Sequence, residues 1–424
     1  MIVASNTTNS LQKRKQSYRS LIFWAAVFFV LLLLRDTYSV GINKYIFLGI
    51  ACVCALYMKT KDLIYLYCFL FPVYVGLPGN FMTLVLLLRF LCETRRFKTT
   101  SLMLTLLLSA FMIFQNFTTG KTAITQMMYI PGLLVVLMLF THRQKLDTTP
   151  MVLMYSAGVA TLGFIMLAST LRVHSLVDLM SNAFRLGTSN AAYTEENIMR
   201  VSVDPNFFGT FAISAISLAF PLFLHDNTSK ITKGCLAIFA FVQLVVALTG
   251  LSRTFILVLL LWITISLLTM RNTKSTVFAV VTISLFFILL VVYMSDVLET
   301  AVGRFDDADI STANGRTTIV NRYWNTWRGN IYYMFFGVGL FRCNVHCVPL
   351  QMLFGGGLIY FILMLALFLS YRPAKTAQRS IMGKLPFFAT FIMMCSVPAA
   401  PLLNCMFPLV IVGLCMQDNK RALC

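Results

Sequence analysis

The stretch TFILVLLLWITISLLTM, residues 254–270, decides the fold of this protein. It contains no charged side chain, and its length approaches the roughly 20 residues that a helix needs to cross the hydrocarbon core of a bilayer. A backbone in lipid must satisfy its own hydrogen bonds, and a helix does so within one segment. The stretch therefore predicts a transmembrane helix.

The rest of the chain has the same character. Of its 424 residues, 58% are hydrophobic and 12% are charged, whereas about 25% of the residues in a soluble domain are charged. We therefore expect an all-α integral membrane protein, with residues 1–424 forming a single polytopic domain of about 12–14 transmembrane helices. The expected spans are 18–34, 43–58, 63–77, 81–93, 101–116, 125–141, 150–171, 206–225, 231–250, 254–270, 276–293, 347–370, 385–401 and 402–418, of which the 63–93 and 385–418 pairs could be hairpins or broken helices.

The formal charge of +19 would suggest a nucleic-acid partner in a soluble protein. Here lysines and arginines gather in alternate connections between spans, as cytoplasmic loops do. When the basic segment 13–19 is placed inside, every inward connection is basic and the short outward connections carry little charge. We therefore expect both termini in the cytoplasm, a lipid bilayer as the surroundings and no nucleic-acid partner.

Two outward connections, 172–205 and 294–346, are much longer than the others. The second carries Arg304, Arg316, Arg322, Arg328 and Arg342. Basic charge on the outer side runs against the usual preference, although long loops cross the membrane largely regardless of their charge. We predict that these two extracytoplasmic regions form the active site.

Two short motifs stand where outer segments meet spans. Asp204, Pro205 and Asn206 follow Arg200, and such residues commonly cap and start a helix. Arg253 stands in a very tight outer turn, where an arginine is costly unless it snorkels, is paired or faces an aqueous site. Each motif by itself is compatible with a purely structural role.

A third motif begins at Arg316, directly after the turn signal Asn314-Gly315. Helical spacing places Ile319, Tyr323 and Trp327 on one stripe of an amphipathic helix lying on the bilayer. Aromatic rings at a membrane interface usually form a simple belt. Aromatic rings can also stack on sugar rings, so Tyr323, Trp324 and Trp327 could contact a sugar substrate or the acceptor of a transferred group.

The scarce histidine His346 follows this helix. Gly337 and Gly339 let the backbone turn closely before it. A neutral histidine can take a proton from an attacking hydroxyl. Arginines bind phosphates through the paired N–H donors of the guanidinium group.

The set Arg200, Arg253, Arg316 and His346 therefore suits one reaction class. This is the transfer of a group from a lipid-linked diphosphate to a sugar hydroxyl, with arginines rather than a metal stabilising the leaving group. We predict no cofactor and no metal.

The order of these motifs resembles the O-antigen polymerase and O-antigen ligase superfamily of bacterial envelope enzymes. The resemblance covers residues 200–370 and runs through Arg-DPN, Ser-Arg at a span start, Asn-Gly-Arg before an aromatic helix, Phe-Gly-Val-Gly and His-x-x-x-Leu-Gln. It implies a membrane glycosyltransferase of the GT-C kind, acting on a glycan carried by undecaprenyl diphosphate. It also implies that His346 is the catalytic histidine and that Arg200, Arg253 and Arg316 bind the diphosphate.

This chain departs from the family pattern at two places. The family often has an asparagine where Cys347 stands, and an acidic residue where this chain has the glycines 355–357.

The resulting interpretation is a polymerase of surface polysaccharide, such as O-antigen or capsule repeat units. It would act at the outer face of the bacterial inner membrane, with a chain-length regulator or a flippase as further partners. One alternative is a ligase that moves the finished glycan to lipid A–core or to a protein. An alternative of another class is a flippase, which would predict ionisable residues near the middle of the membrane.

Several rival constellations remain open at this stage. Cys343, His346 and Cys347 could belong to a metal site if further ligands came from elsewhere. Cys343 and Cys347 could instead form a disulfide in an oxidising compartment. The segment Asp306-Asp307-Ala308-Asp309 could hold a divalent cation, although a solvated acidic turn fits it better.

Overall fold

The chain folds as an all-α polytopic membrane protein. The computed structural model describes residues 19–76, 78–93, 98–118, 129–142, 146–172, 174–175, 186, 203–225, 228–269, 295, 299, 303, 316–340, 342–370, 381–397 and 403–415. Over this part of the chain 86% of the residues are helical and there is no strand. The predicted fold class is therefore confirmed.

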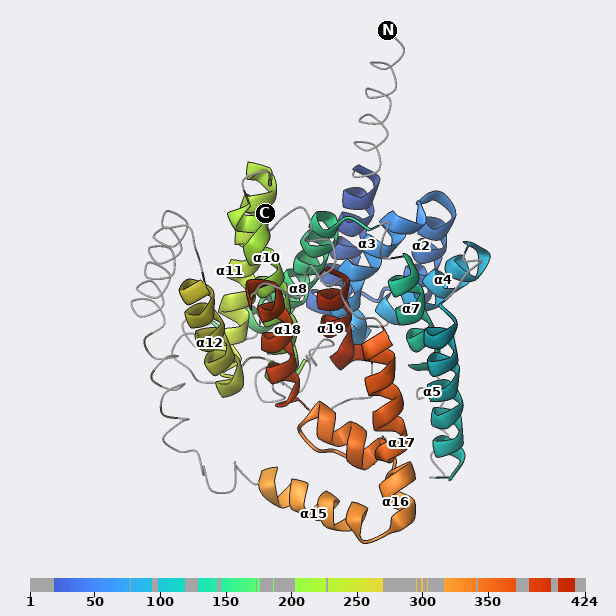
Figure 1. The fold of residues 1–424 in the computed structure, drawn as a ribbon. Coiled ribbons are helices and arrows are strands. Elements are labelled where there is room, and N and C mark those ends of the chain that lie inside the picture. The colour runs from blue at the N-terminus through green and yellow to red at the C-terminus, as the bar shows by residue number, and fades with distance from the viewer. Residues whose placement is uncertain are drawn as a thin grey trace.

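The first half of the chain supplies a run of apolar helices (Figure 1). The first helix, Arg19–Thr37, ends in a π-helical turn. It is followed by α2 (Lys44–Tyr57), α3 (Thr60–Leu70), the 3-10 segment η2 (Phe71–Gly76), α4 (Pro78–Glu93), α5 (Thr99–Thr118), α7 (Tyr129–His142) and α8 (Thr148–Leu171).

The second half adds further spans and two short helices at one end of the molecule. Its helices are α10 (Pro205–Leu224), α11 (Lys230–Thr249), α12 (Arg253–Thr269), α15 (Arg316–Arg328), α16 (Ile331–Phe336), α17 (Val348–Ser370), α18 (Ile381–Met394) and α19 (Leu403–Cys415). Figure 1 shows α15 and α16 beyond the end of α17, lying across the direction of α5 and α17.

Every predicted span overlaps one of these helices except 276–293, which lies outside the described residues. Six described helices are long and apolar enough to cross a membrane, and five shorter apolar helices accompany them. The predicted number of spans stays a prediction. The segments 63–77 and 81–93 form a hairpin of α3 and α4 joined through η2.

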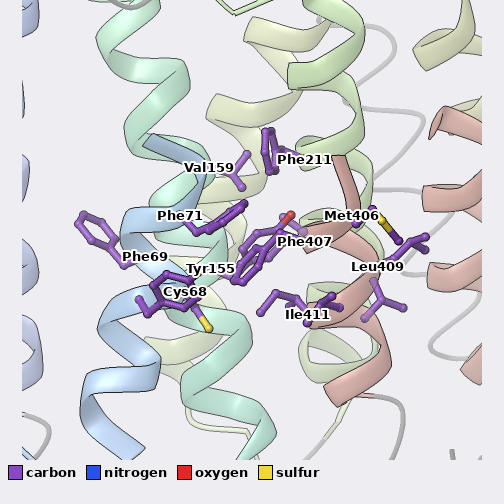
Figure 2. Packing of buried hydrophobic residues seen from close by; sticks show 14 of the residues in the cluster. Cys68, Phe69, Phe71, Tyr155, Val159, Phe211, Met406, Phe407, Leu409 and Ile411 are labelled. Atoms are coloured by element: carbon purple, nitrogen blue, oxygen red, sulfur yellow. The ribbon is translucent and has the colours of Figure 1, made fainter. Parts of the chain in front are cut away.

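The core is centred on α8 and α10. In the most apolar 18-residue stretch of each helix, 72% of the residues of α8 and 78% of those of α10 are buried. Helices that are apolar on all sides are expected in the interior. Around α8, rings from distant segments pack together: the ring centroids of Phe71 and Phe407 lie 3.6 Å apart, and Tyr155 adjoins Phe407 (Figure 2). The Tyr155 hydroxyl also lies 2.7 Å from Ser214 Oγ, which links α8 to α10 in the core.

One small residue permits the close approach of α3 and α8. A Cβ atom at Gly158 would overlap the backbone carbonyl of Phe69. Small residues at helix contacts let backbones approach closely in membrane proteins, and a side chain cannot be accommodated here by a rotamer change because the obstacle is backbone.

We expect Gly158→Ala to push α3 away from α8 and to destabilise the protein by about 1–3 kcal/mol, as overpacking of a core does. The thermal midpoint of the detergent-solubilised protein, followed by size-exclusion chromatography after heating, should fall. The matched control is Gly49→Ala in α2, where a Cβ would meet nothing within 4 Å. Equal midpoints for the two variants would contradict this account of the contact.

Candidate functional site

The DPN segment and the Ser-Arg segment meet at the starts of two helices. Asp204 caps α10 by accepting a hydrogen bond of 2.8 Å from the backbone N–H of Asn206, and Pro205 occupies the first turn. The side chain of Asn206 accepts a hydrogen bond of 2.6 Å from Ser252 Oγ. The Ser252 hydroxyl also accepts a hydrogen bond of 3.3 Å from the backbone N–H of Phe255, and it therefore caps α12. The predicted cap is confirmed, and it fixes Arg253 beside the start of α10.

The glycines before His346 have backbone conformations that other residues rarely adopt. Gly337 has a φ of +78° and Gly339 a φ of +108°. The N–H of Val338 donates to the carbonyl of Phe354 at 2.9 Å, and the N–H of Gly339 donates to that of Gly355 at 3.0 Å. A short piece of extended backbone therefore lies against the first part of α17.

The same contact explains the glycines 355–357. Gly357 has a φ of +75° and breaks α17 into two parts. A Cβ at Gly337 would overlap the carbonyl of Gly355, and a Cβ at Gly357 would overlap that of Phe335. Residues 355–357 are therefore the place where two stretches of backbone approach each other closely.

Two buried glutamines hold this arrangement. The sequence interpretation missed Gln115 and included Gln351 only as the last residue of the His-x-x-x-Leu-Gln motif. Gln115 of α5 donates through Nε2 to the carbonyls of Phe336 at 2.8 Å and Gly355 at 2.7 Å, and its Oε1 accepts the N–H of Leu340 at 3.3 Å. Gln351 donates to the carbonyl of Leu340 at 3.1 Å. Both side chains are 4% exposed. The available signal was a glutamine in an apolar span, because buried amides in a membrane find hydrogen-bond partners.

His346 lies in the turn before α17 and is partly buried. Burial lowers its pKa from the ordinary 6.5, the positive charge of Arg316 lowers it further, and the carboxylate of Asp204 acts in the opposite direction. Both charged groups are therefore close enough to act on the ring. The first residue of α15 and the cap of α10 therefore set the electrostatic surroundings of the histidine.

Two of the three predicted diphosphate-binding arginines lie within the described residues. Arg253 and Arg316 are each partly buried, at the first positions of α12 and α15. Arg200 lies outside the described residues.

Some aromatic side chains of α15 are packed against the protein, and one is exposed. Trp327 is 8% exposed and packs with Cys343, Val345 and Phe354, whereas Trp324 is 40% exposed. The hydroxyl of Tyr323 donates to the carbonyl of Arg342 at 2.9 Å. Two rings of the predicted aromatic set therefore hold the loop that carries His346, and Trp324 presents the most accessible ring.

The rival cysteine arrangements do not form. No three His, Cys, Asp or Glu side chains within the described ranges are placed to share a metal ion, so Cys343, His346 and Cys347 are not a ligand cluster. Cys343 and Cys347 are both free. Burial raises the pKa of the Cys343 thiol to about 12, and this side chain behaves as part of the small core around Trp327. The acidic segment 306–309 lies outside the described residues.

No protein-family model matches the chain, and no curated protein matches it in sequence. The site is therefore interpreted from its own geometry. A partly buried imidazole with a lowered pKa, next to one guanidinium group and one carboxylate, can accept a proton while a neighbouring cation holds an anionic group.

We expect Gln115→Leu to loosen the loop around His346. The substitution removes the Gln115 partner of the Phe336 carbonyl and of the Leu340 N–H, at a cost on the order of 1 kcal/mol or more for each. The Gly355 carbonyl loses one of its two donors and keeps the N–H of Gly339. Cys343 should then react about tenfold faster or more with a maleimide, measured by peptide mass spectrometry. The control is Gln243→Leu, which removes another buried amide that bonds Ser156 instead. If both variants left Cys343 equally protected, Gln115 would not hold the loop.

Proposed function

We propose that the protein is a membrane glycosyltransferase that transfers a glycan from undecaprenyl diphosphate to a sugar hydroxyl, and that it polymerises surface polysaccharide. The observation that carries the proposal is the electrostatic effect of Arg316 and Asp204 on His346, since the three residues come from separate segments of the chain. The resemblance of the motif order to the O-antigen polymerase and ligase superfamily supports the same reaction.

His346 serves as the general base. Its lowered pKa keeps the ring neutral near pH 7, which is the form that accepts a proton. The acceptor hydroxyl oxygen attacks the anomeric carbon, its proton passes to His346, and the bond from that carbon to the phosphate oxygen breaks. The electron pair leaves on the diphosphate. A single displacement of this kind inverts the anomeric configuration.

The arginines bind the diphosphate and stabilise its charge as it leaves. A guanidinium group offers forked donors that match phosphate oxygens, and it is fully charged at any physiological pH. Arg316 already acts on His346. Arg253 starts α12 at the junction fixed by Asn206 and Ser252, and Arg200 precedes this junction in the sequence.

The site faces the outside of a bacterial inner membrane in this proposal, with both termini in the cytoplasm. Helix α10 starts at Asp204 and has 20 residues, so its far end lies roughly 30 Å away. Lys230 and Lys233 follow that far end, at the start of α11. Basic residues prefer the cytoplasmic side, which supports an extracytoplasmic position for Asp204.

We expect His346→Ala to lower glycan extension by about 100-fold or more, the usual contribution of a general base. The measurement is the length of product formed by purified protein from a lipid-linked repeat unit, with thermal stability recorded in parallel. His225→Ala is the control, since His225 ends α10 far from the site. Full-length product from the His346 variant would overturn the proposed role.

The pH dependence of kcat/KM provides a separate test. Activity requires neutral His346, so it should fall as the pH drops through the pKa of this ring, with a midpoint below 6.5. Asp204→Asn keeps a residue that caps helices equally well but removes the charge that raises this pKa. The acid limb should therefore move to lower pH. An unchanged or raised midpoint would contradict the proposed electrostatics.

A further inference from the structure

Helix α15 turns an apolar side toward the rest of the protein. Val320, Tyr323 and Trp327 pack in the small core beneath the helix, and the hydroxyl of Tyr323 donates a hydrogen bond to the carbonyl of Arg342. Two rings of the predicted membrane-facing stripe are therefore engaged in contacts within the protein. The side of the helix that stays open to an external partner is a different one.

The remaining surface of α15 is exposed and consists mainly of polar side chains. Helical spacing places Asn321, Trp324 and Arg328 on one stripe of this surface, and Thr318, Arg322 and Asn325 on the next. All six residues are exposed, and we call them the polar face of α15. Figure 1 shows the helix lying across one end of the molecule, beyond α17.

The two arginines of the polar face are not neutralised by a carboxylate. Within the described part of the chain, the ion pairs join Arg35 to Asp36 and Arg89 to Glu93. The sequence contains no Asp or Glu between residues 310 and 417. The guanidinium carbon of Arg322 lies 5.6 Å from the centroid of the Tyr323 ring, a contact that favours a position on the helix surface. The polar face is therefore electropositive and attracts anions.

The other side chains of the polar face suit a sugar. The amides of Asn321 and Asn325 offer both donors and acceptors, as sugar hydroxyls require. The ring of Trp324 is 40% exposed. Its centroid lies 5.5 Å from that of Trp327 and 6.1 Å from that of Phe354. These contacts order the ring in advance, so a sugar that stacks on it has less entropy to overcome.

We propose that the polar face binds an acidic glycan, whose carboxylates pair with Arg322 and Arg328. The inference rests on the proposed function, since it names the class of sugar chain that the enzyme handles. Arg316 of the proposed site is the first of the 13 residues of α15, and the helix extends about 20 Å from it. A glycan leading away from the site can therefore lie along α15, with Trp324 between the two arginines.

An anionic phospholipid surface matches the polar face less well. A helix that lies on a bilayer inserts its apolar side among the lipids. The apolar side of α15 is instead packed on the loop before α17 and on Phe354. Guanidinium groups match carboxylates through two parallel N–H donors, and together with the amides and the tryptophan they favour a glycan over a lipid headgroup.

The experiment measures binding of fluorescent oligogalacturonic acid to the purified full chain in nanodiscs of a zwitterionic lipid. The comparison ligand is its methyl ester, which has the same sugar backbone without the charges. We expect the wild type to prefer the acid. Arg322→Gln/Arg328→Gln should weaken binding of the acid about tenfold, because two exposed ion pairs together contribute about that much. The control, Lys230→Gln/Lys233→Gln at the start of α11, removes two charges elsewhere and should bind as the wild type does.

Two results would overturn the inference. One is equal affinity of the wild type for the acid and the ester, or equal losses in the two double variants. The other comes from nanodiscs that contain photoactivatable phosphatidylglycerol: cross-links to residues 317–328 that the Arg322→Gln/Arg328→Gln variant loses would assign the polar face to lipid. Cross-links that spare these residues would support the glycan.

Failure of this inference can be told apart from failure of the proposed function. His346→Ala should bind the acid as tightly as the wild type, because the histidine is not part of the polar face. If the wild type extends a lipid-linked repeat unit but does not distinguish the acid from the ester, the acidic glycan is wrong and the transfer reaction stands. If the arginine-dependent binding is found but no repeat unit is extended, the transfer reaction is wrong and the glycan surface stands.

Discussion

The structure around His346 depends on the pairing of backbone between residues 337–339 and residues 354–355. Non-helical backbone at the edge of a membrane protein must find partners for its polar groups. Here the partners are the carbonyls of Phe354 and Gly355, together with the amide of Gln115, which reaches three backbone groups from α5. Glycines at the points of contact are required because any side chain would overlap the opposing backbone.

This pairing determines the electrostatic surroundings of the histidine. It places the loop after Gly339 beside the first part of α17, and Tyr323 and Trp327 of α15 pack onto that loop. Arg316, at the start of the same helix, is thereby brought near His346. The carboxylate of Asp204, which caps α10, raises the pKa of the ring and so opposes the effect of Arg316. A change in any of these three elements would alter the pKa of the histidine.

Much of the fold could be predicted because the thickness of the bilayer sets the length of each span. The apolar stretches 150–171, 206–225 and 231–250 coincide closely with α8, α10 and α11. Local turn chemistry was also readable: the Asp204 cap and the positive φ angles of Gly337 and Gly339 follow from residue types. The helix α15 was predicted as well. Ile319 of its predicted stripe is exposed and Trp327 is buried, which could not be predicted because burial depends on which segment covers the helix.

The sequence by itself determined that the chain is an apolar helical membrane protein, where most of its helices lie, and which scarce polar residues stand at their ends. The tertiary structure decided which of those residues meet. Gln115 contacts a loop more than two hundred residues further along the chain, and Cys343 packs in the small core around Trp327 instead of pairing with Cys347. The physical reason is that spacing along the sequence fixes the length and the faces of a helix, whereas contacts between distant segments arise only when the helices pack.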